Sequence, residues 1–379
     1  MLKGEGQFSR KCIDEALDLL KAVCPIPAPS HNEDRRVDFI MDWLKDKGIE
    51  AHVDRAKNVI IPYNDDGVRP LDVFAAHTDV VFPDTTALPM RQEGDILHCP
   101  GVADDSANFV AVLMYALEFH RLRPETENGV LFVCDSCEEG LGNLHGIRAL
   151  CEDYGERMAS FTSFDSILGR GIVSTAIGSE RYRITVRTAG GHSFADFGSP
   201  NAIAQLAQII TKLYGQRTDS RLTTYNVGTV EGGTSVNTIA QEASCTYEFR
   251  SSSEDSLDRM RGLFESIISS FRARNMDISV ECIGTRPCSC GVDTKALEDV
   301  AERLSASYGL STRRGASSTD CNIPLSLGIP SICFGLIYGE GTHKREEWAD
   351  LSSYPKGLDL GWDYILAVTG ADAHAWPSL

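Results

Sequence analysis

Short apolar runs alternate with amphipathic stretches in the first part of the chain. The runs predict strands at 50–62, 71–76, 129–135 and 160–165, and helical spacing of apolar residues predicts helices at 9–23 and 108–121. A third helix is predicted between Ser30, its expected N-cap, and Gly48. This alternation is typical of a doubly wound α/β fold, in which helices cover both faces of a mostly parallel sheet.

The pattern changes after Gly178. Apolar Tyr182, Ile184 and Val186 alternate with arginines, which indicates a half-exposed antiparallel strand. The segments that follow predict a strand-helix-strand-strand-helix-strand unit, at 182–186, 200–214, 225–231, 243–250, 254–272 and 277–283. This order is that of an inserted α+β (ferredoxin-like) domain.

After Pro287 the α/β pattern resumes, with a helix at 293–308 and strands at 311–314 and 329–335. The predicted fold class is therefore α/β, with one discontinuous domain, 1–177 and 286–379, and one inserted domain, 178–285.

Charge and composition exclude several classes of function. The 379 residues carry 36 Lys and Arg against 54 Asp and Glu, a net charge of −18 that disfavours nucleic-acid binding. No apolar run has the length of a membrane span, and the N-terminal residues 1–6 lack the apolar core of a signal peptide. We therefore expect a cytoplasmic protein without membrane partners, whose 12 cysteines are free thiols. The closely spaced Cys288 and Cys290 lack the further ligands of a structural zinc site.

Candidate chemistry gathers just beyond the predicted strands. His77 and Asp79 follow the strand at 71–76, at the end where open α/β sheets bind ligands. Alone, such a pair is also an ordinary surface pair. Further acidic residues and one histidine follow at ordered intervals, so the candidate metal ligands are His77, Asp104, Glu139, Asp165 and His343.

These ligand types indicate a catalytic metal centre. Imidazole and carboxylate donors without thiolates suit Zn²⁺, Mn²⁺ or Co²⁺. Five ligands exceed the roughly three protein ligands of one catalytic zinc, but they suit two ions that share a carboxylate. Glu138, beside Glu139, is a candidate general base. Asp79 is a candidate acceptor for the free ring N–H of His77.

The ordered motifs resemble the M20 family of metallopeptidases, which includes peptidase T, glutamate carboxypeptidase and acyl-amino-acid deacetylases. The resemblance covers about residues 10–350 and rests on His77-Thr78-Asp79, Gly101-Val102-Ala103-Asp104-Asp105, Glu138-Glu139-Gly140, Phe164-Asp165, Gly191-His192-Ser193, Gly232-Gly233-Thr234-Ser235-Val236-Asn237, Phe249-Arg250-Ser251, Thr342-His343 and Glu347-Trp348. It implies a catalytic dinuclear-metal domain and a lid and dimerisation domain at 178–285.

The resemblance also implies individual roles. His77, Asp104 and Asp165 would hold one metal ion, and Asp104, Glu139 and His343 the other, with zinc expected and cobalt or manganese as alternatives. The peptide bond after Asp104 would be cis. Asp79 and Glu138 would be catalytic, with Glu138 as the base that activates the attacking water.

Three residues of the inserted domain are candidates for substrate binding in a homodimer. By resemblance, His192 would reach the other subunit's site, Arg250 would bind a substrate carboxylate, and Asn237 would be a hydrogen-bond donor. A turn histidine, a surface charge and a turn former are the alternative interpretations. Edge strands of the inserted domain can pair with a second copy, and two-fold dimers are the commonest.

The leading functional hypothesis is hydrolysis of peptide bonds in di- or tripeptides. The alternative is an amidohydrolase that deacylates N-acyl amino acids, because both reactions use the same metals and base. An M28 aminopeptidase and an inactive binding protein are less consistent with the inserted domain and with the complete ligand set. Two departures are notable, Ser106-Ala107-Asn108 after the acidic pair and His192-Ser193-Phe194 in the lid. The first predicts an altered helix start, and the second argues against tripeptide specificity. Preference for the amino or the carboxyl end stays open.

Overall fold

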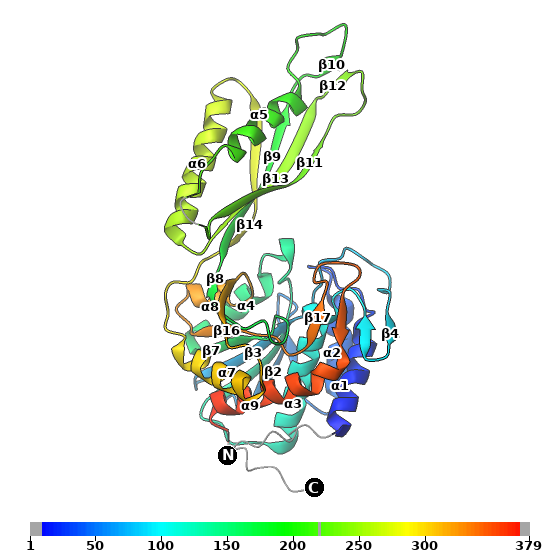
Figure 1. Ribbon diagram of the computed structural model, residues 1–379, viewed down its shortest axis with the longest axis vertical. Helices are drawn as coiled ribbons and strands as arrows, with labels where there is room; N and C mark the ends of the chain where they lie inside the picture. Colours follow the sequence, from blue (N-terminus) through cyan, green and yellow to red (C-terminus); the bar gives the residue numbers. More distant parts are fainter. Residues whose placement is uncertain (1–9, 219–220, 372–379) are drawn as a thin grey trace. The chain divides into compact units, whose positions relative to one another are not determined.

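The chain divides into two compact units, Met1–Ala176 with Cys290–Leu379, and Ile177–Ser289 (Figure 1). The computed structural model describes residues 10–218 and 221–371. The first unit is built on an eight-stranded sheet in the order β1-β2-β6-β3-β7-β16-β8-β15. Its strands are β1 (His52–Val53), β2 (Val59–Tyr63), β3 (Leu71–His77), β6 (Gly129–Asp135), β7 (Met158–Ser163), β8 (Ile172–Ala176), β15 (Arg314–Ser317) and β16 (Ser331–Cys333).

Strand β3 lies at the centre and runs parallel to both of its neighbours, β6 and β7. All seven of its residues are buried. Side chains alternate between the two faces, so Phe74 and Ala76 belong to one core while Val73 and Ala75 belong to the other. A strand buried on both faces reads as a continuous apolar run, which is why this one is evident in the sequence.

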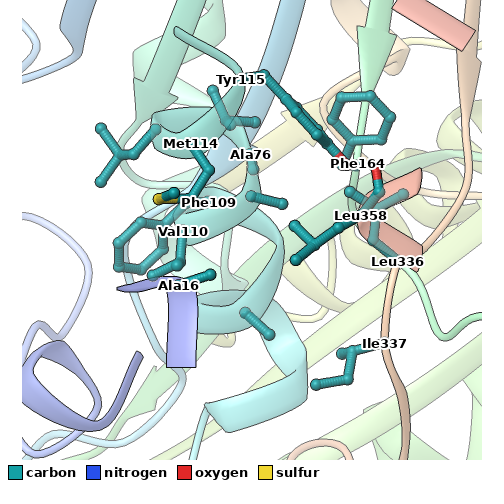
Figure 2. Packing of buried hydrophobic residues seen from close by; sticks show 14 of the residues in the cluster. Ala16, Ala76, Phe109, Val110, Met114, Tyr115, Phe164, Leu336, Ile337 and Leu358 are labelled. Atoms are coloured by element: carbon teal, nitrogen blue, oxygen red, sulfur yellow. Dashed lines mark hydrogen bonds between the residues drawn. The ribbon is translucent and has the colours of Figure 1, made fainter. Parts of the chain in front are cut away.

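Helices cover both faces of this sheet. One core is closed by α1 (Arg10–Val23), α2 (Asp34–Asp46), α3 (Ala107–Leu122), α7 (Lys295–Ser307) and α9 (Tyr354–Thr369). The opposite core is closed by α4 (His145–Tyr154) and α8 (Asn322–Ser326). Figure 2 shows the centre of the larger core, where Phe109, Val110 and Met114 of α3 lie near Ala16 of α1. This packing fixes the start of α3, which begins at Ala107, two residues after the acidic pair Asp104-Asp105.

A close backbone approach in this core gives a stability prediction. A Cβ added at Gly357 of α9 would overlap the Leu336 carbonyl oxygen. Since a backbone carbonyl cannot swing aside, Gly357→Ala is expected to lower the free energy of unfolding by about 3 kcal/mol. At the exposed Gly262 a Cβ meets nothing within 4 Å, so Gly262→Ala should raise it by about 0.5–1 kcal/mol. Thermal unfolding followed by circular dichroism checks the pair, and a parental melting temperature in Gly357→Ala would contradict the packing.

The second unit is an antiparallel sheet in the order β11-β13-β9-β14 with two helices on its apolar face. Along the chain the elements are strand, helix, strand, strand, helix, strand, which is the ferredoxin-like order. They are β9 (Gly178–Arg187), α5 (Ala202–Tyr214), β11 (Thr224–Gly232), β13 (Glu242–Ser251), α6 (Glu254–Arg272) and β14 (Asp277–Arg286). A two-stranded ladder joins β10 (Gly191–His192) to β12 (Thr238–Ile239).

The predicted fold class is confirmed: a mostly parallel α/β sheet and a separate α+β unit. Several local predictions were wrong or incomplete. The strand predicted at 311–314 is β15, Arg314–Ser317, and the first residue of the first predicted helix, Ser9, lies outside the described residues. Unpredicted elements include α4, α9 and a small sheet of β4 (Arg91–Glu93), β5 (Ile96–His98), β17 (Tyr338–Glu340) and β18 (Trp348–Asp350). Within the described part of the chain, no helix is both long and apolar enough to cross a bilayer.

Candidate metal centre

Three neighbouring parallel strands bring the predicted site residues to one edge of the sheet. His77 is the last residue of β3, Glu138 and Glu139 follow β6, and Asp165 follows β7. Since the carboxyl ends of parallel strands share an edge, these side chains converge there.

Asp104 lies between two histidines. Its Oδ1 is 3.1 Å from His77 Nε2, and its Oδ2 is 3.3 Å from His343 Nε2. His343 Nε2 is also 3.2 Å from Glu139 Oε1. The two oxygens of one carboxylate therefore face two different imidazoles, which is the arrangement that a shared, bridging ligand requires.

Asp165 and Glu138 complete the cluster. Asp165 Oδ1 lies 3.9 Å from His77 Nε2. Possible ligand atoms of His77, Glu138 and Asp165 lie within 4.8 Å of one another, as do those of His77, Asp104 and Glu139. All five predicted ligands thus come together, but so does Glu138, and proximity alone does not separate a base from a ligand.

Asp79 has more partners than the sequence indicates. His77 Nδ1 lies 3.1 Å from the Asp79 carbonyl oxygen and 3.4 Å from its Oδ1. The Asp79 carboxylate also accepts the backbone N–H groups of Glu138 and Glu139, each at 3.0 Å. Ser30, predicted as a helix N-cap, instead donates its hydroxyl to Asp79 Oδ2 at 2.6 Å, and Glu33 occupies the N-cap position of α2. Asp79 therefore orients His77 and holds the loop that carries both glutamates.

Burial perturbs the acid groups of this cluster. Burial raises the pKa of Asp165 well above its usual range, and burial with the nearby Asp104 charge raises the pKa of Glu139 to about 7. Hydrogen bonds to Asp104 and Glu139 raise the pKa of His343 to about 10. Burial works against ionisation of Asp104 too, yet hydrogen bonds with His343 and His77 hold its pKa below the usual range. The histidines of the cluster therefore neutralise the negative charge of its buried carboxylates only in part.

Divalent cations fit this cluster. The donors are imidazole nitrogens and carboxylate oxygens, which suit Zn²⁺, Mn²⁺ and Co²⁺, and two cations would neutralise the surplus of buried carboxylate charge. The position of Asp104 between His77 and His343 fits two ions better than one.

Glu347 is a structural partner of the site whose role was not predicted. Its buried carboxylate accepts the backbone N–H groups of Gly101, Ala103 and Asp104 at 2.9, 2.8 and 3.0 Å. Glu347 thereby joins the loop that carries His343 to the turn that carries Asp104. In the sequence, Glu347 belongs to the Glu347-Trp348 motif of the resemblance, four residues after His343.

Asn108 connects the start of α3 to the acidic turn. Its amide donates to Asp105 Oδ1 at 2.5 Å, and its Oδ1 accepts the Leu336 N–H at 3.0 Å. Asp105 Oδ2 in turn accepts the His77 N–H at 3.0 Å. The Asp104-Asp105 peptide bond is cis. Asn108 therefore anchors the acidic turn from the first turn of α3, in the stretch that departs from the family pattern.

The three predicted substrate-binding residues belong to the second unit. His192 and Asn237 are neighbours, since the Ser193 N–H donates to the Asn237 carbonyl at 3.0 Å. His192 Nδ1 accepts the N–H groups of Phe194 and Ala195 at 3.2 and 3.3 Å, so the neutral ring carries its proton on Nε2. Arg250 lies apart from them on β13, where its Nε donates to Glu248 at 3.2 Å.

The chain is similar to several known proteins. The model of peptidase family M20/M25/M40 matches residues 73–366. Succinyl-diaminopimelate desuccinylase from Corynebacterium glutamicum is 23% identical over 351 residues, which cover 88% of this chain and 92% of the relative. The crystal structure of a tripeptidase from Staphylococcus aureus is 19% identical with a TM-score of 0.77, over 94% of this chain and 99% of that chain. A dinuclear metal-binding M20 peptidase from Bacillus subtilis is 16% identical with a TM-score of 0.65, over 96% and 100%.

Proposed function

The chain belongs to peptidase family M20/M25/M40 and is a hydrolase, and from this premise we propose that it cleaves the peptide bonds of di- and tripeptides with two divalent metal ions. The observation that carries the proposal is the Asp104 carboxylate, whose oxygens face His77 on one side and His343 on the other. Zinc is the proposed metal, and cobalt or manganese would suit the same donors.

The proposed ligands divide into two sets. His77, Asp104 and Asp165 hold one ion, and Asp104, Glu139 and His343 hold the other. The hydrogen-bonding distances from Asp104 to both histidines and from His343 to Glu139 support this division. When bound, such ions polarise the scissile carbonyl and lower the pKa of water towards about 7.

Glu138 is the proposed general base. Its carboxylate takes the proton of the attacking water and delivers it to the amide nitrogen, which leaves poorly unless it is protonated. Asp79 acts indirectly: it orients His77 and accepts hydrogen bonds from the backbone N–H groups of Glu138 and Glu139. Because Asp79 fixes the main chain of Glu138, the Glu138 side chain is held beside the metal ligands.

Deacylation of N-acyl amino acids is the second candidate. The desuccinylase from Corynebacterium glutamicum supports it, because that enzyme's name denotes removal of an acyl group from an amino acid. The tripeptidase from Staphylococcus aureus supports the peptidase hypothesis. Both reactions cleave an amide bond, so the proposed ligands and base serve either one.

A substrate screen tests the proposal. Chelator-treated protein is supplied with Zn²⁺, Mn²⁺ or Co²⁺ and offered dipeptides, tripeptides and N-acyl amino acids, including N-succinyl compounds. We expect hydrolysis of short peptides that depends on added metal. Hydrolysis of only the N-acyl compounds would replace the first candidate by the second, and no metal-dependent hydrolysis of any of these classes would contradict the proposal.

We further propose that the protein is a homodimer and that His192, Asn237 and Arg250 bind the substrate. The Nε2 proton of His192 is a suitable donor for a developing oxyanion. The planar guanidinium of Arg250, 37% exposed in its side chain, suits a substrate carboxylate. In this proposal His192 acts in the site of the partner subunit.

Mixing two inactive variants tests the exchange of His192. Glu138→Gln and His192→Ala chains are each expected to be nearly inactive alone. After mixing and re-association at equal amounts, half of the dimers are mixed and each has one intact site, so about one quarter of the parental activity should return. Sedimentation measures the dimer directly. A fully active monomer, or no recovery in verified mixed dimers, would contradict action in trans.

A further inference from the structure

Arg36 is a buried cation that the proposed mechanism does not use. It lies in the first turn of α2 and has 0% exposure. Among the described residues its hydrogen bonds go to backbone carbonyls: Nη1 to Thr78 at 2.8 Å, Nε to Ile26 at 2.9 Å and Nη2 to Cys24 at 3.4 Å. Burying a charge is costly, so its place in the fold calls for a compensating interaction.

The Thr78 carbonyl connects Arg36 to the metal centre. Thr78 stands between His77 and Asp79, and its own N–H and hydroxyl donate to the Asp135 carbonyl at 2.7 and 2.8 Å. The segment that leaves β3 is therefore held from two sides, by the end of β6 and by Arg36. Without the Arg36 contact, only the end of β6 would hold the Thr78 backbone.

Two carboxylates that hold the ligand loops also contribute to the electrostatic environment of Arg36. Burial lowers the pKa of Arg36, whereas electrostatic interactions with Cys24, Cys99, Asp79 and Glu347, in decreasing order, favour the guanidinium ion. The Asp79 carboxylate accepts hydrogen bonds from the backbone N–H groups of Glu138 and Glu139. The Glu347 carboxylate accepts one from the N–H of Asp104. Both carboxylates therefore bind the backbone of a proposed ligand, Asp79 that of Glu139 and Glu347 that of Asp104.

We propose that Arg36 is a positioning residue of the metal centre, which fixes the segment from His77 to Asp79 through its hydrogen bond to the Thr78 carbonyl. This inference rests on the proposed metal centre. Arg36 touches no substrate and acts only through these neighbours. A purely structural role, in which Arg36 ties α2 to the turn after α1, predicts lower stability without any change in metal affinity.

Metal affinity separates the two roles. Chelator-treated parent, Arg36→Met, Arg36→Lys and Arg35→Met are titrated with Zn²⁺ against a chromophoric chelator, at a temperature where circular dichroism shows each to be folded. Met keeps the apolar stem but removes charge and donors, and Lys keeps the charge without the planar fork. Arg35 is the exposed neighbour on the same helix and provides the matched control.

We expect Arg36→Met to raise the Kd for Zn²⁺ by about 10–100-fold, as outer partners of metal ligands do. Arg36→Lys should fall between Arg36→Met and the parent, and Arg35→Met should match the parent. If Arg36→Met does not fold, Arg36→Gln, which keeps one amide donor but no charge, is held to the same criterion. A parental Kd in the folded variant, with or without a lower melting temperature, would overturn this inference alone. A parent that binds no metal would overturn the proposed function and this inference with it.

Discussion

Glu138→Gln is expected to lower kcat by about 10²–10⁴-fold while the metal content and KM stay near those of the parent. Glutamine keeps the size of the side chain but cannot accept the proton of the attacking water. The main-chain N–H of Glu138 still donates to Asp79, so the loop should keep its shape. Steady-state kinetics together with elemental analysis of the purified variant measure both effects.

Glu139→Gln is the matched control, since the two glutamates are adjacent and equally buried, each with 5% exposure. Glu139 Oε1 lies 3.2 Å from His343 Nε2, and both residues are proposed ligands of the same ion. Loss of the Glu139 carboxylate should therefore reduce metal content as well as activity. The geometry makes this comparison necessary, since Glu138 is also close enough to His77 and Asp165 to be a ligand. If Glu138→Gln loses metal and Glu139→Gln retains both ions, the roles of the two residues are reversed.

Asp104→Ala should remove both metal ions and all measurable hydrolysis. Its two carboxylate oxygens face the two histidines, so in the proposed assignment neither ion keeps a complete ligand set without it. The loss of affinity should exceed the about 10–100-fold that outer partners cost. Elemental analysis and activity assays on the folded variant check this result.

His343→Ala provides a graded comparison and His52→Ala a control. His343 has a side chain that is 57% exposed, so its removal should leave the core intact and lower metal content from two ions to one. His52 is exposed in β1 and belongs to no proposed ligand set, so its variant should behave like the parent. Normal metal content with normal turnover in Asp104→Ala or His343→Ala would refute the ligand assignment.

Buried parallel strands were the most predictable part of the fold. β3 and β6 were evident because burial on both faces demands a continuous apolar run. The small sheet of β4, β5, β17 and β18 was missed because each of its strands has only three residues. Helix α9 was missed because it is buried on most sides, which weakens the contrast between its faces.

The candidate site divides in the same way. Residues that directly follow a predicted strand, such as His77 and Asp165, could be selected because strand ends share one edge of the sheet. The contacts of Ser30, Arg36 and Glu347 could not be predicted, because their partners lie 49, 42 and about 245 positions away along the chain. Their roles depend on which loops the fold brings together, and no local periodicity records that.

The number of metal ions that restores hydrolysis tests the central claim most directly. Chelator-treated protein is titrated with Zn²⁺ under conditions of tight binding while hydrolysis of a short peptide and bound metal are measured in the same samples. A dinuclear hydrolase predicts that two ions bind per chain and that full activity requires both. Saturation of binding and activity at one ion per chain, or full activity without any metal, would contradict the account.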